Sequence, residues 1–219
     1  MHGRSQLDML INAYREGVFP MADSADDPSF AFYRPYQRGI IPIESVHIPS
    51  KLLKVLRRHD YMVTINQSFE AVIDGCAAAK DKRSTTWINR PIRDLFVALH
   101  HEGRAHSIET RRHDGTLIGG LYGLAIGRVF CGESMFSEEP NASKIALIHL
   151  CALLWSSGFT TLDTQFINPH LLQFGAYEIP QEEYEERIAT EMAEDIPLQR
   201  PSGDEFKSLL ERFLSERKV

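Results

Sequence analysis

The sequence has no apolar run close to the ~20 residues that a helix needs to cross a bilayer. Residues 1–6 also lack the apolar core of a secretory signal peptide, and the chain contains neither an internal repeat nor a low-complexity tract. These absences predict a globular protein that acts in the cytoplasm and has no membrane partner. No feature indicates an oligomer, so a monomer is the default expectation.

Cysteine is scarce, and its placement argues against a metal site. Cys76, Cys131 and Cys151 are widely spaced among apolar neighbours, and no Cys-x-x-Cys or Cys/His cluster has the spacing of a zinc site. The histidines are scattered, and none stands with a serine or cysteine in the order of a catalytic triad. We therefore expect buried free thiols in a reducing compartment, no metal and no metal-dependent catalysis.

A surplus of basic residues is absent as well. The formal net charge is −6, from 24 Lys and Arg against 30 Asp and Glu, which disfavours DNA and any general nucleic-acid coat. A local basic stripe does occur in the helix predicted at 51–58, where Lys51, Lys54, Arg57 and Arg58 recur at helical spacing. Such a stripe is usually a solvated helix face, and contact with nucleic-acid phosphates is the alternative. The spacing alone favours the solvated face.

Apolar periodicity predicts helices and strands of an α/β (α+β) protein. Hydrophobic residues occupy 43% of the 219 positions, which is enough for a substantial core. Besides 51–58, helices are predicted at 5–17, 68–79, 91–102, 142–155, 181–194 and 205–216, the last of them expected to be the most mobile part. Strands are predicted at 40–48, 61–65, 105–110, 116–124, 129–131 and 159–165, and a polar loop at 80–85.

Polar residues at the ends of two predicted strands form a candidate site. Residues two apart on a strand point to the same face, so the side chains of Asp163 and Gln165 should project together, with Thr164 facing away. An acid beside an amide at the exit of a buried strand can bind a substrate, or the two groups can simply satisfy each other. Glu133, after the strand at 129–131, is either a structural cap or a carboxylate for a cationic substrate group.

The order strand meander, helix, strand is that of acyl-transfer folds of the N-acetyltransferase type. Those folds usually hold the coenzyme A pyrophosphate in a glycine-rich turn before the helix. The corresponding turn here, 136–142, has no glycine and carries Glu138 and Glu139. This composition argues against a coenzyme A donor, and a CoA-dependent N-acyltransferase is kept as an alternative.

Eight short segments together resemble one known family. In order they read GVFP (17–20), TWI (86–88), HSIE (106–109), GGLYG (119–123), CGESMFS (131–137), NASK (141–144), LDTQ (162–165) and GAYEIP (175–180). The combination, spread over about residues 7–190, resembles the bacterial leucyl/phenylalanyl-tRNA–protein transferases. Each segment is weak evidence alone, whereas GESMFS followed by NASK and LDTQ is highly specific as a set.

The resemblance implies a fold and a reaction. The fold would be an acetyltransferase-like mixed-sheet catalytic domain over 61–195, with a smaller N-terminal α/β domain over 1–60 and a C-terminal tail over 196–219. The reaction would move Leu or Phe, with Met as a further candidate, from aminoacyl-tRNA to the α-amino group of a protein that begins with Arg or Lys. The product would be a degradation signal. No cofactor is implied, because an aminoacyl ester is already activated.

The resemblance also implies roles on the acceptor side. Asp163 and Gln165 would form a catalytic relay in which Gln165 is either a base or an orienting group. Glu133 would pair with the cationic N-terminal residue of the acceptor, and Asn168 matches a polar position of the site. A related group of transferases modifies acidic N-termini instead. Glu133 argues against that specificity because it would repel an acidic residue.

On the donor side the resemblance implies an apolar pocket and an aromatic stack for the terminal adenine. Trp87 matches an aromatic residue of the site, and Leu121 matches a position of the pocket. Phe32 and Tyr33 stand where the family often has two tryptophans. Further pocket candidates are Leu147, Leu150 and Leu154. A leucine stripe is more often plain core. The basic stripe at 51–58 coincides with a helix that the family uses on the tRNA acceptor stem, so the resemblance reverses the preference for a solvated face. A tRNA-binding module without catalysis is the third hypothesis.

Overall fold

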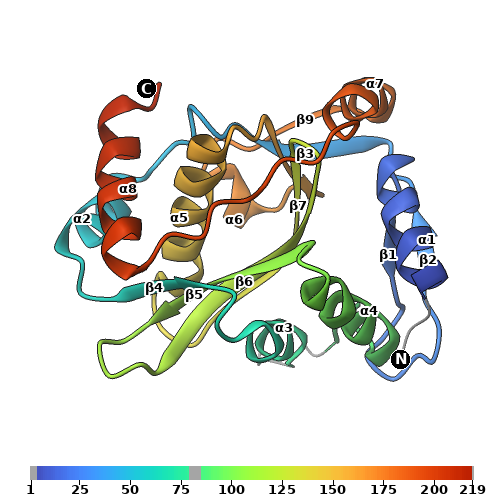
Figure 1. Cartoon of the computed structure of the whole chain (residues 1–219), viewed down its shortest axis with the longest axis horizontal. Helices are drawn as coiled ribbons and strands as arrows, with labels where there is room; N and C mark the ends of the chain where they lie inside the picture. Colours follow the sequence, from blue (N-terminus) through green and yellow to red (C-terminus); the bar gives the residue numbers. More distant parts are fainter. Residues whose placement is uncertain (1–3, 79–84, 219) are drawn as a thin grey trace.

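The computed structural model describes residues 4–78 and 85–218, so the polar loop predicted at 80–85 lies outside the described residues except for Thr85. A seven-stranded mixed sheet runs through the protein, with helices on both of its faces (Figure 1). In sheet order the strands are β4 (Met62–Ile65), β5 (Ala105–Arg111), β6 (Leu117–Ile126), β7 (Val129–Ser137), β8 (Thr161–Gln165), β3 (Gln37–Ile41) and β9 (Tyr177–Pro180). A separate two-stranded ribbon pairs β1 (Phe19–Met21) with β2 (Ala31–Tyr33).

Each face of the sheet carries its own hydrophobic core. On one face lie α2 (Ser50–Arg58), α5 (Ala142–Ser157), α6 (Pro169–Leu172) and α8 (Gly203–Glu216), and on the other lie α1 (Arg4–Arg15), α3 (Phe69–Ala77), α4 (Arg90–His101) and α7 (Gln181–Glu191). The alternation of a strand supplies both cores, because Ile41 of β3 is buried in the first and its neighbour Ile40 in the second.

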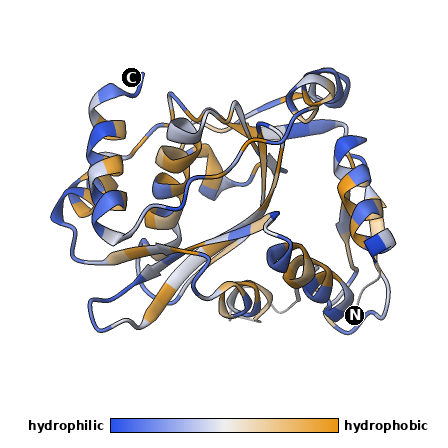
Figure 2. Cartoon of the chain, in the orientation of Figure 1, coloured by the Kyte–Doolittle hydropathy of each residue, from blue (hydrophilic) through white to orange (hydrophobic). Residues whose placement is uncertain are grey.

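The central helix α5 is apolar on nearly every side because it is covered on nearly every side. It packs on β5, β6 and β7 and is covered in turn by α2 and α8. In Figure 2 the apolar side of α8 faces α5. The helix ends at Gly158, whose φ of 81° is a left-handed conformation that favours glycine as the helix stop.

The chain crosses over through α5 from β7 to β8, which are parallel neighbours in the sheet. Their pairing stops at Cys131 and Asp163, although β7 continues to Ser137 beside β6. The two strands therefore part beyond this point. The residues that follow it on each strand are free to line a cavity.

The prediction of a mixed-sheet α/β fold is confirmed, and all seven predicted helices are present with small changes at their ends. Two predicted strands are wrong in extent. The strand expected at 40–48 is β3, which starts three residues earlier and ends before Pro42, because proline lacks the N–H that a ladder needs. The strand expected at 129–131 continues through Gly132 to Ser137. Helix α2 begins at Ser50, and Pro49 occupies its N-cap position.

The C-terminal segment packs against the core, and its expected mobility stays a prediction. Helix α8 buries Phe206, Leu210 and Phe213 in the core beside α5, and Ser202 and Glu205 form a capping box at its start. The proposed division of the chain at residues 60 and 195 stays a prediction. Strand β3, which precedes residue 60, hydrogen-bonds to β8 and β9 within the large sheet.

The packing of α8 predicts a stability effect. Replacing the fully buried Phe213 by alanine is expected to lower the free energy of unfolding by about 3–5 kcal/mol, because a large cavity remains in the core. The exposed Lys207 on the same helix is the matched control, and Lys207→Ala is expected to change it by less than about 0.5 kcal/mol. Urea unfolding measures both. Equal values for the two variants would mean that α8 does not contribute to the core.

Candidate active site

A pocket of about 500 Å³ opens where β7 and β8 part. A volume of this size is typical of small-molecule sites. Of the residues singled out in the sequence, those in its wall are Trp87, Leu121, Glu133, Leu147, Leu150, Gln165 and Asn168. The others are outside this wall: Phe32, Tyr33, Asp163, Leu154 and the four basic residues of α2.

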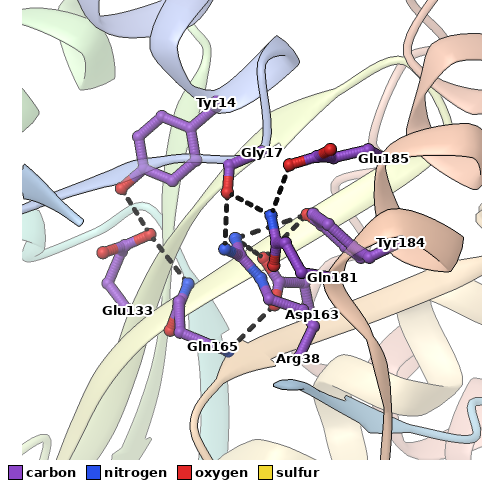
Figure 3. A network of polar contacts seen from close by, with 9 residues as sticks. All are labelled: Tyr14, Gly17, Arg38, Glu133, Asp163, Gln165, Gln181, Tyr184 and Glu185. Atoms are coloured by element: carbon purple, nitrogen blue, oxygen red, sulfur yellow. Dashed lines mark hydrogen bonds and ion pairs between the residues drawn. The ribbon is translucent and has the colours of Figure 1, made fainter. Parts of the chain in front are cut away.

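Asp163 is completely buried behind the pocket, at the centre of a polar network (Figure 3). Its Oδ1 accepts hydrogen bonds from Arg38 Nε and from the backbone N–H of Gln165, both at 2.8 Å. Its Oδ2 accepts from Arg38 Nη2 at 2.6 Å and from the Tyr184 hydroxyl at 2.9 Å. Each oxygen thus accepts two hydrogen bonds.

Arg38 on β3 is the partner that sequence analysis missed. It has no exposed surface, forms a bidentate ion pair with Asp163, and donates from Nη1 to the carbonyl of Gly17 at 3.0 Å. Its guanidinium lies 4.8 Å from the ring centroid of Phe19 and 4.3 Å from that of Tyr184. Burial lowers the pKa of Arg38, but the charge and hydrogen bonds of Asp163, together with the charges of Tyr184 and Cys131, more than offset this, so the pKa rises above its ordinary value. The sequence did contain one signal for Arg38, because it is a charged residue directly before the apolar run at 39–41.

Gln165 does not project beside Asp163 as the strand alternation predicted. Its φ of 55° is left-handed, which turns the side chain out of the strand pattern at the end of β8. The link between the two residues runs through the backbone N–H of Gln165, and the side-chain Nε2 lies 3.4 Å from Glu133 Oε1 instead. The expected contact between the Gln165 amide and the Asp163 carboxylate is therefore corrected to a backbone contact.

Glu133 is half-buried in the pocket wall, on β7. Its Oε1 accepts a hydrogen bond of 2.8 Å from the hydroxyl of Tyr14, a buried residue of α1 that sequence analysis also missed. Burial raises the pKa of Glu133 to about 8; the Tyr14 hydrogen bond works in the opposite direction, and the charge of Asp163 adds to the rise. Glu133 is therefore a group that can exchange a proton near neutral pH.

One end of the pocket is apolar. Leu121 of β6 and Leu147 and Leu150 of α5 meet there, with further walls from Ile41, Met135 and Leu162. Leu154, one turn further along α5, is buried in the core and does not reach the pocket. Leu121, Leu147 and Leu150 thus belong to the core that contains α5, whereas Glu133 hydrogen-bonds to Tyr14 of α1, on the other face of the sheet.

The aromatic candidates are divided between two places. Trp87 lines the pocket, whereas Phe32 and Tyr33 lie on the exposed ribbon strand β2, with 40% and 38% of their surface exposed. Phe166, which follows Gln165, is 49% exposed in the pocket wall and packs edge-on against Phe19 with ring centroids 5.5 Å apart. Sequence analysis missed Phe166, although its place directly after the candidate site was a usable signal.

Asn168 stands at the start of α6, where its side-chain oxygen caps the helix by accepting from the N–H of Leu171 at 3.0 Å. The side-chain NH₂ group of Asn168 is the part that remains for the pocket. This residue combines a structural role with a place in the wall.

The basic stripe of α2 is exposed, while Leu52 and Leu56 of the same helix are buried. Within the described ranges, none of Lys51, Lys54, Arg57 and Arg58 forms an ion pair with a carboxylate. The stripe is therefore open to a polyanionic partner.

Other predicted features are placed as follows. Cys76, Cys131 and Cys151 are free and buried, as expected. Among residues 4–78 and 85–218, no group of three His, Cys, Asp or Glu side chains could hold a metal ion. In the same residues, no helix has both the length and the apolar character needed to cross a membrane.

Comparison with known proteins finds close relatives along most of the chain. The sequence model of the family described as leucyl/phenylalanyl-tRNA protein transferase matches residues 40–189, and that of its N-terminal domain matches residues 6–35. Two curated leucyl/phenylalanyl-tRNA–protein transferases are 46% identical to the chain, one from Rhodopseudomonas palustris (94% of this chain and 93% of that protein) and one from Nitrobacter winogradskyi (94% of each). A third, from Novosphingobium aromaticivorans, is 51% identical over 81% of this chain and 67% of that protein.

Among solved structures, the chain has a remote likeness to one described as L-PGS from Bacillus licheniformis. That match has 13% identity and a TM-score of 0.39, and it covers 76% of this chain and 52% of the other. The relatives and the family match carry the assignment: the chain belongs to the leucyl/phenylalanyl-tRNA protein transferase family and is an aminoacyltransferase, as its sequence motifs predicted.

Proposed function

We propose that the protein transfers Leu or Phe, with Met as a further candidate, from aminoacyl-tRNA to the α-amino group of cytoplasmic proteins that begin with Arg or Lys. The product would mark those proteins for degradation. The observation that carries this proposal is the pocket between β7 and β8, which joins an apolar end to a wall with a carboxylate and an amide. An apolar aminoacyl group and a cationic amine would meet at that junction.

The apolar end suits the side chain of the donor. Leu121, Leu147 and Leu150 would surround the Leu or Phe side chain, and burial of such a side chain contributes about 1.5–3 kcal/mol. Trp87 would stack on the terminal adenine from within the wall. Phe32 and Tyr33, exposed on β2, remain candidates for a stack on the same nucleotide from outside the pocket.

The polar wall suits the acceptor. Glu133 would pair with the positively charged N-terminal residue, and the Asn168 amide would donate to a carbonyl oxygen of substrate. The Gln165 amide would orient the attacking amine. Asp163 would act through Gln165, because its hydrogen bond to the Gln165 backbone holds that residue in place at the end of β8.

The reaction needs little beyond positioning. An aminoacyl ester is already activated, so formation of the peptide bond requires a neutral amine held close to the ester carbonyl, without ATP or a metal. The basic stripe on α2 would hold the tRNA by its phosphates, which leaves the pocket to hold only the aminoacylated end.

The proposed activity is tested with labelled Leu-tRNA and Phe-tRNA and with peptides that begin with Arg, Lys, Asp or Ala. Label is expected on the Arg and Lys peptides only, because Glu133 attracts a cationic residue and repels an acidic one. Transfer to the Asp peptide would contradict the role of Glu133. Transfer to none of them, with binding of tRNA intact, would leave a tRNA-binding module. Transfer from acetyl-CoA would support the N-acyltransferase alternative.

The buried ion pair predicts how stability and activity separate. Asp163→Ala is expected to lower the free energy of unfolding by about 3–5 kcal/mol, because Arg38 keeps a charge without a partner in the interior. The double variant Arg38→Met/Asp163→Leu is expected to regain most of that stability in urea unfolding, since apolar pairs often replace buried ion pairs without loss. It is nevertheless expected to remain inactive in transfer. An active double variant would show that Asp163 does not position Gln165.

The basic stripe predicts a salt effect on tRNA binding. In Lys54→Gln/Arg57→Gln the slope of log affinity against log salt is expected to fall by about 1 per lost charge. Transfer from a short aminoacyl-adenosine donor, which lacks the tRNA stem, is expected to be unchanged. Lys207→Gln on α8 is the matched control. An unchanged salt slope in the α2 variant would mean that the stripe is a solvated helix face that does not contact tRNA.

A further inference from the structure

Asp163 is poorly placed to take a proton from the acceptor. Both of its oxygens already accept two hydrogen bonds, from Arg38, Tyr184 and the Gln165 backbone, and its side chain has no exposed surface. A proton arriving at Asp163 would break the ion pair with Arg38 inside the protein, which is costly. Asp163 is therefore a positioning residue.

Gln165 is an equally poor acceptor of a proton. A neutral amide has an oxygen that accepts hydrogen bonds but is not basic at physiological pH. Its Nε2 points to Glu133 rather than to Asp163, at 3.4 Å (Figure 3). The side-chain amide of Gln165 therefore links the acceptor amine to Glu133 and not to Asp163.

Glu133 is the carboxylate that the pocket leaves available. Among the described residues that line the pocket it is the only acid. Its Oε1 accepts from Tyr14 at 2.8 Å, and its Oε2 has no hydrogen-bond donor within the part of the chain that is described. Glu133 therefore presents one oxygen that is held in place and one that is open to a ligand.

Resting on the proposed function, we propose that Glu133 is the catalytic proton acceptor, which takes a proton from the α-ammonium group of the acceptor through Oε2, while Tyr14 and Gln165 position its carboxylate. The resulting neutral amine attacks the ester carbonyl carbon, and the bond from that carbon to the 3′ oxygen of the tRNA breaks. The amine's second proton leaves with the 3′ oxygen as a hydroxyl. Glu133 then returns its own proton to solvent.

The electrostatics around Glu133 agree with this role. The titratable and charged groups that face it or its partners are Tyr14 of α1, Tyr122 of β6, Cys131 of β7, Arg38 of β3 and Asp163 of β8. Burial raises the pKa of Glu133 to about 8, close to the ~7.7–8.0 of an α-amino group. Proton exchange between two groups of matched pKa has a small free-energy cost in either direction. The guanidinium of an N-terminal Arg side chain has a far higher pKa, so it would not give its proton to Glu133.

The test is the pH dependence of single-turnover transfer at saturating peptide, over a range of about pH 6 to about pH 9 that brackets the pKa of an α-amino group. In Glu133→Gln the amine must lose its proton to water. Transfer is then expected to be about 100-fold slower than wild type at the acid end and to approach wild type at the alkaline end. A peptide that begins with citrulline, the neutral isostere of Arg, binds without the side-chain charge but has the same α-ammonium group. At a saturating concentration of that peptide, the same pH dependence of the ratio is therefore expected.

Two further variants keep the test independent of folding. Glu133→Asp retains a carboxylate and is expected to regain part of the rate at the acid end. Tyr14→Phe keeps the buried ring but removes the hydroxyl that lowers the pKa of Glu133, so that pKa rises and the ascending limb of the rate moves to higher pH. The matched control is Glu186→Gln on the exposed side of α7, which is expected to follow the wild-type profile.

The opposite outcomes are distinct. A ratio of wild type to Glu133→Gln that is constant across pH and disappears with the citrulline peptide would leave Glu133 only the pairing with the cationic side chain that the proposed function gives it, and would overturn this proposal alone. Failure of the wild-type protein to transfer label to any peptide would overturn the proposed function as well. This result needs only the wild-type protein, so the two failures can be distinguished.

Discussion

The buried ion pair between Arg38 and Asp163 is the interaction on which the site depends. A guanidinium and a carboxylate that have both left water are stable only when they meet in good geometry and their remaining donors and acceptors are used. Two short contacts join this pair, and Gly17, Tyr184 and the Gln165 backbone use most of what remains. Because these partners follow α1 or belong to β8 and α7, the pair holds segments from both ends of the chain around one wall of the pocket.

The architecture of the sheet brings two carboxylates together in different environments. Cys131 and Asp163 are partners in the parallel pair of β7 and β8, and Glu133 lies two residues beyond Cys131, where the strands part. Asp163 therefore sits on the closed side of this point, neutralised by Arg38, while Glu133 sits on the open side with a hydroxyl as its partner. These two environments agree with the tasks proposed for the two acids, with Asp163 holding the backbone of Gln165 and Glu133 exchanging a proton.

Much of the fold could be predicted from the sequence, because apolar periodicity and turn residues act locally. The helices and the meander from β5 to β7 follow that pattern, and Gly158 and the Ser202–Glu205 capping box mark helix ends as their chemistry requires. Burial between segments far apart in the sequence could not be predicted in this way. Phe213 of α8 is buried in the core beside α5, for example, and no local pattern of residues marks that contact.

The site divides in the same way. The motifs in the sequence were sufficient to select the family and to name Glu133, Gln165 and Asn168 as residues of one pocket, because each motif is a short run of residue types. Arg38 and Tyr14 were not accessible in this way, since an arginine and a tyrosine within apolar runs carry no mark of the partner they meet over a hundred residues away. The direction of the Gln165 side chain also depends on a left-handed φ that arises where β8 ends against β3. The sequence alone determines the residue types and their local spacing. The partner of each buried charge depends on which strands become neighbours, and the order of the strands depends on burial of the whole sheet.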